Sequence, residues 1–329
     1  MGKIILVPIE RIEQRYSVQW WDWLEAAMTE LGREFICVGD YAMREIKAGQ
    51  FLDIAETNTY KFSQLQEIIN MIQNGEDIDT IFFMDYWFPG VQALAYIRDN
   101  MGIDFKIKGM LHAGTYDDTD FITQNGCGVW GNDFERSLLK IADQVIVGSQ
   151  IHRQTLINKL GEHCKITVRP YPVYDCAEYV GQVQKENIVV FPHRLGWDKQ
   201  PYLFEALERM YNEMYGGRGL KTVKFVRTLD HKLSKDEYYK LLAKSKVVFS
   251  AALHELFGLA MLEGVNCGCY PVAPNRLAYR ETLAEYPLYE NLGQAVRLTH
   301  EVIMGARRPL PGRYNQGMMM DIAKEVINQ

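Results

Sequence analysis

The chain has 329 residues, 47% of them hydrophobic and 24% charged, and this composition excludes a mainly disordered protein. Its length exceeds that of one ordinary domain of about 150 residues, so we expect two domains. The formal net charge is −6 and is uneven, because residues 1–175 carry −9 and residues 176–329 carry +3. The negative charge of the first half is not typical of a protein that binds polyanions in general. The positive charge of the second half is compatible with binding of a small anion.

Cellular location and redox state follow from the apolar runs and the cysteines. No apolar run reaches the roughly 18 residues of a membrane-spanning helix. The short run at 3–7 predicts a buried strand rather than a signal peptide. We therefore expect a cytoplasmic protein. The six cysteines contain no C-x-x-C pair, which favours reduced core thiols over disulfides or a structural metal.

Short apolar runs alternate with helical patterns along the first half of the chain. We predict strands at 3–7, 35–38, 80–84, 106–111 and 144–147, and helices at 17–31 and 62–73. This alternation is typical of a parallel sheet with helices on both faces. Residues 1–172 are expected to form one Rossmann-like domain, and residues 173–186, which lack periodicity, a linker.

The same alternation restarts after the linker. We predict strands at 187–192, 222–226, 247–250 and 269–273, and helices at 200–215, 235–243 and 255–267. Residues 187–310 are therefore expected to form a second Rossmann-like domain. The final segment, 311–329, holds a helix at 315–329 that is expected to pack back on the first domain. Two doubly wound domains facing a central cleft are the expected assembly.

The most informative segment runs from Ser250 to Glu263, from the carboxyl end of a predicted strand into a predicted helix. Open parallel sheets bind ligands at such places. Free N–H groups at a helix start attract anions such as a diphosphate, and Gly258 lets a ligand approach the backbone. Glu263 follows Glu255 by about two helical turns, so both carboxylates are expected on one face. Glu263 is then placed to accept hydrogen bonds from both hydroxyls of a ribose.

This segment resembles the retaining GT-B glycosyltransferases, in particular glycosyltransferase family 4. Glu255 and Glu263 match the family's hallmark E-x(7)-E, and a Pro-Val stretch follows at 271–272. Residues 190–199 resemble the family's strand and G-R-L-x-x-x-K loop, in which the Arg and the Lys, here Arg194 and Lys199, hold the donor diphosphate. Residues 142–149 give a weaker match to the last strand of the family's first domain, so the resemblance covers about 140–285.

The resemblance implies an enzyme that moves a sugar from a nucleoside diphosphate, expected to be UDP, to an acceptor hydroxyl with retention of configuration. It implies no metal ion and no cofactor, because the helix dipole and two cations replace the metal. His112 follows the predicted strand 106–111, where the family often has a histidine near the donor sugar, although a structural role is equally open. The implied catalytic residues are Glu255, His112, Arg194 and Lys199. The implied donor-binding residues are Arg194, Lys199, Glu255, Leu256, Phe257, Gly258, Leu259 and Glu263.

The acceptor side departs from the family, because large charged residues replace its usual Gly-rich turn after the first strand. Arg11, Arg15 and Tyr16 are candidate acceptor contacts, together with Asp117. We interpret residues 117–120 as a polar loop rather than the D-x-D metal motif of another transferase class. Trp20, Trp21 and Trp23 are interpreted mainly as core, although an exposed tryptophan could also stack on a planar acceptor.

Two faint resemblances concern the acceptor. The Glu-Arg-x(3)-Arg-Tyr opening at 10–16 resembles glycosyltransferases of tailed phages, some relatives of which modify hydroxymethylated pyrimidines in DNA; the location would then be the host cytoplasm. The Pro-His-Arg at 192–194, with the Asp-Lys at 198–199, also resembles the glycosyltransferase that mannosylates a modified base in transfer RNA.

Three hypotheses remain open at this point. The first is transfer of a sugar to a hydroxymethylated base in phage DNA, although the acidic first half counts against a DNA partner. The second is transfer to a small-molecule or glycan acceptor; a membrane-bound acceptor is disfavoured because the predicted helix 17–31 has no Lys or Arg. The third is a sugar-nucleotide-binding module without catalysis. A Rossmann dehydrogenase is set aside for lack of G-x-G-x-x-G, and the sequence does not indicate an oligomeric state.

Overall fold

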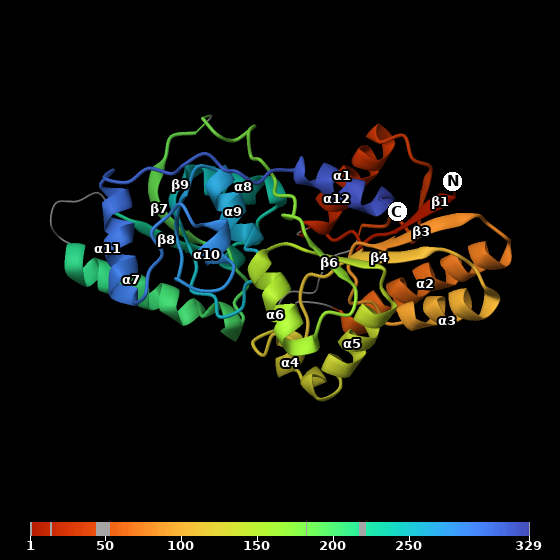
Figure 1. Cartoon of the computed structure of the whole chain (residues 1–329). Coiled ribbons are helices and arrows are strands. Elements are labelled where there is room, and N and C mark those ends of the chain that lie inside the picture. The colour runs from red at the N-terminus through yellow and green to blue at the C-terminus, as the bar shows by residue number, and fades with distance from the viewer. Residues whose placement is uncertain (1, 14, 44–52, 182, 217–221, 329) are drawn as a thin grey trace. The chain divides into compact units, whose positions relative to one another are not determined.

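The computed structural model describes residues 2–13, 15–43, 53–181, 183–216 and 222–328. The chain divides into two compact units (Figure 1). Unit 1 comprises Met1–Pro170 and Gly317–Gln329, and unit 2 comprises Tyr171–Gln316. The first boundary thus lies at 170 rather than 172, and the final helix belongs to unit 1.

The segments expected as a linker (173–186) and as part of the tail (311–316) are integral to unit 2. The Val173 N–H donates to the Asn315 carbonyl at 3.3 Å. The Asn266 side-chain amide donates to the carbonyls of Tyr174 and Tyr314, at 2.7 and 2.8 Å. These hydrogen bonds hold both segments against the unit and explain why neither is a free linker.

Unit 1 is built on a six-stranded parallel sheet in the order β2-β1-β3-β4-β5-β6. Its strands are β1 (Lys3–Val7), β2 (Phe35–Cys37), β3 (Ile78–Phe83), β4 (Lys106–Met110), β5 (Gln144–Val147) and β6 (Lys165–Val168). Its helices are α1 (Ser17–Glu30), α2 (Ile54–Gln73), α3 (Val91–Met101), α4 (Phe121–Gln124), α5 (Gly131–Ile141), α6 (Gln150–Leu160) and α12 (Met318–Ile327), with a 3-10 turn η1 (Cys127–Val129). Within this unit, α1 and α12 lie on one side of the sheet and α2 and α3 on the other (Figure 1).

Unit 2 is built on a four-stranded parallel sheet in the order β10-β9-β7-β8. Its strands are β7 (Glu186–Phe191), β8 (Lys224–Arg227), β9 (Ser245–Phe249) and β10 (Tyr270–Val272). Its helices are α7 (Pro201–Tyr215), α8 (Lys235–Lys244), α9 (Leu259–Asn266), α10 (Tyr279–Thr282) and α11 (Leu292–Ile303), with 3-10 turns η2 (Trp197–Lys199) and η3 (Thr228–Asp230). The carboxyl-terminal residues of β7 and β9 are buried and are mostly valine and phenylalanine, as expected for central parallel strands.

In each sheet there is one point where successive strands stop being added on one side of the first strand and continue on its other side. In unit 1 this switch point lies between β1 and β3, and in unit 2 between β7 and β9. Ligands of doubly wound sheets bind outside the carboxyl ends of the strands at this point. The topology therefore places one candidate binding region in each unit, formed by the loops that follow these strands.

Helix α12 is fastened to unit 1 by a buried lysine on β4. The Lys108 ammonium donates to the carbonyls of Glu325 (3.0 Å), Val326 (3.1 Å) and Asn328, at the end of the helix. The last carbonyls of a helix lack donor partners from a following turn, so the ammonium caps this end of α12. Burial lowers the pKa of Lys108. Gln144 on β5 donates to the Glu325 carboxylate at 2.7 Å and adds a second tie.

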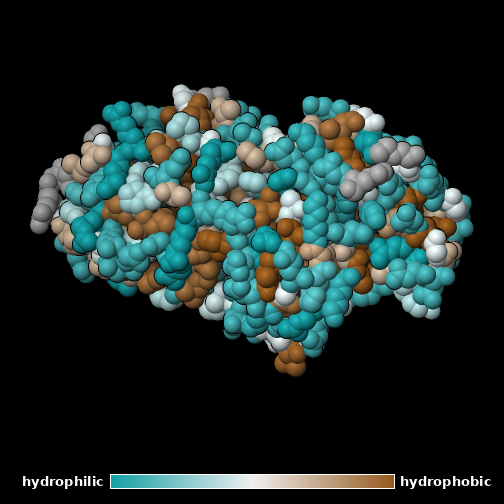
Figure 2. Space-filling model, in the orientation of Figure 1, coloured by the Kyte–Doolittle hydropathy of each residue, from teal (hydrophilic) through white to brown (hydrophobic). Residues whose placement is uncertain are grey.

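The surface agrees with an ordinary globular chain. On the face shown in Figure 2, hydrophilic side chains cover most of the area and hydrophobic ones gather only in small separate patches. Among the residues that the structure describes, no helix has both the length and the apolar character needed to cross a membrane.

Candidate functional site

The loops that follow β7 and β9 meet at the switch point of unit 2. The Leu253 N–H donates to the Asp198 carbonyl at 2.7 Å. The Lys199 ammonium donates to the His254 carbonyl and lies 3.4 Å from Glu255 Oε2. Two residues that the sequence analysis selected from distant motifs, Lys199 and Glu255, are thus in direct contact.

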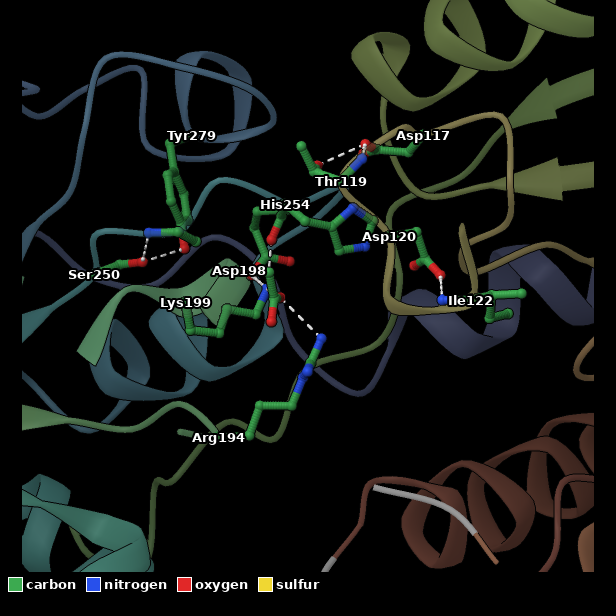
Figure 3. Close-up of polar contacts among 12 residues, drawn as sticks. Asp117, Thr119, Asp120, Ile122, Arg194, Asp198, Lys199, Ser250, His254 and Tyr279 are labelled. Carbon is green, nitrogen blue, oxygen red and sulfur yellow. Dashed lines mark hydrogen bonds and ion pairs between the residues drawn. The ribbon is translucent and has the colours of Figure 1, made fainter. Parts of the chain in front are cut away.

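Asp198 joins the two predicted cations in one network. Its Oδ2 accepts a hydrogen bond from Arg194 Nη2 at 2.8 Å (Figure 3) and lies 3.6 Å from the Lys199 ammonium. Asp198 is completely buried, whereas the Arg194 side chain is 28% exposed. In this structure Asp198 lies beside both cations and Glu255 beside Lys199, and the guanidinium of Arg194 has N–H groups beyond the one that Asp198 accepts. The sequence analysis named Asp198 only within a resemblance and gave it no role in the site; its position between two predicted phosphate ligands was the available signal.

Glu255 lies in the loop before helix α9, not on it. The helix begins at Leu259 after Gly258, whose φ is +94°, so the expectation that Glu255 and Glu263 share a helical face is wrong. Burial alone would raise the pKa of Glu255, but the positive charge of Lys199 and the hydrogen bond from its ammonium hold it below the usual value. Glu255 is therefore an ionised carboxylate at neutral pH.

A buried tyrosine that the sequence analysis missed supports this loop. The Tyr279 hydroxyl is 2.8 Å from Ser250 Oγ (Figure 3). A Cβ added to Gly258 would lie 3.0 Å from the Tyr279 ring, so the close packing there requires a glycine. The Ala278 N–H donates to the Glu255 carbonyl at 3.3 Å, which fixes the backbone as well.

The remaining predicted donor residues fall into two groups. Leu256 and Phe257 are 3% and 4% exposed, and Phe257 packs against Tyr171 and Tyr314. Their side chains belong to the core, so only their backbone is available to a ligand. Leu259 is the first residue of α9, where free backbone N–H groups favour anions.

Glu263 lies on α9 and is held by two tyrosines of α8. The Tyr238 hydroxyl donates to Oε2 at 3.0 Å and the Tyr239 hydroxyl to Oε1 at 2.9 Å. Because a carboxylate has about four acceptor positions, both oxygens can still accept further hydrogen bonds. The sequence analysis did not identify either tyrosine, since no helical spacing relates α8 to α9.

In unit 1, His112 and Tyr16 lie together near the carboxyl ends of the strands. The imidazole Nε2 of His112 is 2.5 Å from the Met84 carbonyl, and its ring centroid is 5.2 Å from Trp20 and 6.0 Å from Tyr16. Burial lowers the pKa of His112. Burial, and to a lesser degree the charge of Asp85, raises the pKa of Tyr16 to about 12. Both side chains are therefore neutral at physiological pH.

The other predicted acceptor residues make local contacts. Arg11 pairs with Asp22 at 2.9 Å and lies over the Trp21 ring at 5.2 Å. Asp117 is 8% exposed, and its Oδ1 accepts from the N–H and hydroxyl of Thr119 (Figure 3). Arg15 is partly buried and acts electrostatically on the neighbouring Tyr16. Trp20 and Trp21 are each 1% exposed, which agrees with their interpretation as core.

A further carboxylate, Glu135, organises the loops after β3 and β4. It is 1% exposed and accepts from Trp87 Nε1 (2.9 Å), from the N–H and hydroxyl of Thr115 (2.6 and 2.9 Å) and from the Tyr116 N–H (3.2 Å). Burial raises the pKa of Glu135, although these donors oppose the shift. The sequence analysis did not detect this residue, because its partners lie 19 to 48 positions away.

No group of three or more His, Cys, Asp or Glu side chains suited to hold a metal ion occurs within the described ranges. The pair Asp118 and Asp120 of the D-x-D alternative has separate partners. Asp118 pairs with Lys159 at 2.8 Å, and Asp120 caps helix α4 through the Ile122 N–H at 2.8 Å.

One curated relative is similar in sequence over part of the chain. The tRNA-queuosine alpha-mannosyltransferase of Drosophila melanogaster is 32% identical over 124 aligned positions, which cover 31% of this chain and 32% of the relative. The chain therefore matches about a third of the relative's length. No family model matches the chain.

Several solved structures are similar along the whole chain. Sucrose-phosphate synthase from Thermosynechococcus elongatus matches 100% of this chain and 95% of its own at 14% identity, with a TM-score of 0.62. An alpha,alpha-trehalose-phosphate synthase (UDP-forming) from Burkholderia vietnamiensis matches 98% and 95% at 12% identity, with a TM-score of 0.60. A trehalose-6-phosphate structure from E. coli, bound with UDP-2-fluoro glucose, matches 98% and 96% at 11% identity, with a TM-score of 0.59. These likenesses confirm the predicted α/β fold of GT-B type.

Proposed function

We propose that this chain is a glycosyltransferase that uses a nucleotide sugar as donor. The proposal rests chiefly on one observation, the meeting of Lys199 and Glu255 at the switch point of unit 2, with Arg194 linked to them through Asp198. Cations, a carboxylate and a helix N-terminus are the groups needed to bind a diphosphate and the sugar beside it. The GT-B-type fold and the partial similarity to a mannosyltransferase support this choice over a binding module.

The proposed chemistry assigns one task to each group. Arg194, Lys199 and the start of α9 offset the negative charge that grows on the departing diphosphate, which is UDP in the preferred version. Glu255 contacts the donor sugar and Glu263 the ribose. The reaction retains anomeric configuration and needs no metal ion, because the cations and the helix dipole act in its place. His112, Tyr16 and the neighbouring loops of unit 1 are proposed for the acceptor.

For the acceptor we propose a hydroxyl on a modified base of a nucleic acid. The name of the Drosophila relative favours a base in transfer RNA, while the opening at 10–16 favours a hydroxymethylated pyrimidine in DNA. Either acceptor carries phosphates, so the rate should fall steeply with salt concentration. A flat salt profile would instead favour a small-molecule or glycan acceptor.

The deciding experiment is a thermal-shift panel of nucleoside diphosphates and nucleotide sugars in excess chelator. A ligand that binds only the folded state raises the unfolding midpoint. We expect one nucleotide sugar to stand out, and the labelled form of that donor then to be transferred to transfer RNA or to hydroxymethylated DNA with chelator still present. No shift with any diphosphate would contradict the proposed function. Activity that chelator abolishes and Mn²⁺ restores would contradict metal independence alone.

A further inference from the structure

His193 lies two residues beyond the end of β7, in the loop that also holds Arg194, Asp198 and Lys199. It is 5% exposed. Its ring meets Phe191 edge-on, with centroids 5.1 Å apart and planes at 72°. Phe191 is itself fully buried, so the imidazole packs on the core of unit 2.

The buried Nε2 of His193 has no hydrogen-bond partner among the residues that the structure describes. Buried polar side-chain atoms in proteins are nearly always hydrogen-bonded, so an unpaired one needs an explanation. A phenylalanine would make the same ring contact with Phe191 and leave no nitrogen unpaired. Packing alone therefore does not account for a histidine at this position.

The charges that act on His193 belong to the candidate donor site. Burial, the largest influence, and the charges of Lys199 and Arg194 together lower the pKa of His193 to about 3, although Glu255 opposes them. The ring is therefore neutral at physiological pH and offers one N–H and one lone pair. Asp198 in the same loop also has a buried oxygen, Oδ1, that lacks a partner within the described ranges.

We propose that His193 binds the diphosphate of the donor by donating its imidazole N–H to the phosphate next to the sugar. This inference rests on the proposed function. Arg194 and Lys199 draw the anionic part of a donor to this loop, and phosphate oxygens accept hydrogen bonds but do not donate them. A neutral N–H adds a third contact without the repulsion that a third cation would bring. Because Nε2 is covered in this structure, the proposal requires that donor binding uncovers this atom.

The test is calorimetric titration of the full chain with UDP and UMP, and with GDP and GMP. His193→Phe keeps the ring contact with Phe191 and removes both nitrogens. We expect it to weaken binding of the diphosphate about tenfold, the effect of one hydrogen bond to a charged group, and to leave the monophosphate within about twofold. His193→Gln retains an N–H donor and should restore part of the loss.

His300 provides a matched control, because it is a histidine of helix α11 outside the candidate site. Its ring stacks on the ring of Tyr215, with centroids 3.6 Å apart. His300→Phe should leave all affinities unchanged. Unchanged diphosphate binding in the His193 variants overturns the inference, and so does an equal loss of monophosphate and diphosphate, which indicates general distortion. If His193→Phe does not fold, His193→Leu replaces it. If the wild type binds no diphosphate, the proposed function itself fails.

Discussion

Lys199 connects the two loops of the candidate site more directly than any spacing in the sequence could indicate. Its ammonium contacts the His254 carbonyl, Glu255 and the buried Asp198. Lysine here therefore has two tasks in the proposed enzyme, because it positions Glu255 and stabilises the charge of the leaving diphosphate.

Lys199→Met should lower kcat by about 100-fold or more, with a smaller change in the affinity for UDP, because the charge on the diphosphate is greatest in the transition state. Steady-state kinetics and calorimetry measure the two effects. Lys240→Met is the control, since this exposed lysine on α8 pairs with Asp236 in its own helix. Equal kcat in both variants would remove Lys199 from the mechanism.

Glu263 gives a second prediction for the donor. Glu263→Ala should weaken binding of UDP about 100-fold, because two hydrogen bonds from the ribose to a charged acceptor are lost. It also leaves Tyr238 and Tyr239 without their shared acceptor, so Tyr238→Phe and Tyr239→Phe serve as controls for that effect. Calorimetry with UDP measures all three variants. A loss in the tyrosine variants as large as in Glu263→Ala would show that orientation of the carboxylate, not contact with ribose, is decisive.

The residues that the sequence could identify share one property: their signal is local. Arg194, Lys199, Glu255 and Glu263 stand at short spacings beside predicted strands and helices. Tyr238, Tyr239, Tyr279 and Glu135 act through partners distant in sequence, so no spacing reveals them. Asp117 is a different case. The sequence made it a candidate acceptor contact, but its carboxylate accepts a hydrogen bond from the Thr119 N–H within the same turn.

Helix α9 shows why element boundaries are harder to predict than element types. The apolar pattern continues through Leu256 and Phe257, so a helix over 255–267 was expected, but the chain first makes a tight bend at Gly258 and the helix is Leu259–Asn266. For helix α2 the predicted helix was too short and not too long. Its first two turns are polar, yet Asp53 caps them by accepting from the Glu56 N–H, and the helix starts eight residues earlier than expected, at Ile54.

Gly258→Ala tests this bend. The φ of +94° disfavours any residue with a Cβ, and the added atom would press on Tyr279. We expect the free energy of unfolding to fall by about 1–2 kcal/mol, as measured by urea denaturation. Gly293→Ala, in the first turn of α11 where a Cβ meets only ordinary contact at 3.4 Å, should be neutral or mildly stabilising. Comparable losses at both positions would contradict the explanation.

At the scale of the whole molecule, the alternation of strands and helices was enough to predict two doubly wound units. The positions of the boundaries were not available from the same pattern. Residues 171–186 lack periodicity but are bound into unit 2 through Asn266 and Asn315. Helix α12 belongs to unit 1 because Lys108, 217 positions before Glu325, caps its end.

Lys108→Met tests how far unit 1 depends on that cap. The change leaves three carbonyls at the end of α12 without their donor, so we expect a loss of about 2–4 kcal/mol in the free energy of unfolding. Hydrogen exchange at residues 318–327 should quicken. Lys106→Met on the same strand is the control, because Lys106 is 45% exposed and lies 3.6 Å from Asp143. Unaltered exchange in α12 would contradict the role of Lys108.

The return of α12 to unit 1 has a consequence for the order in which the molecule is made. A ribosome synthesises every residue of unit 2 before it reaches Gly317. During that time unit 1 has all the strands of its sheet but lacks its last helix. Met319, Ile322, Ala323 and Val326 are buried against unit 1, and until they emerge the apolar surface that they cover is open to water or to a chaperone. A nonsense codon near residue 316 would therefore destabilise unit 1, which is translated first, and leave the residues of unit 2 complete.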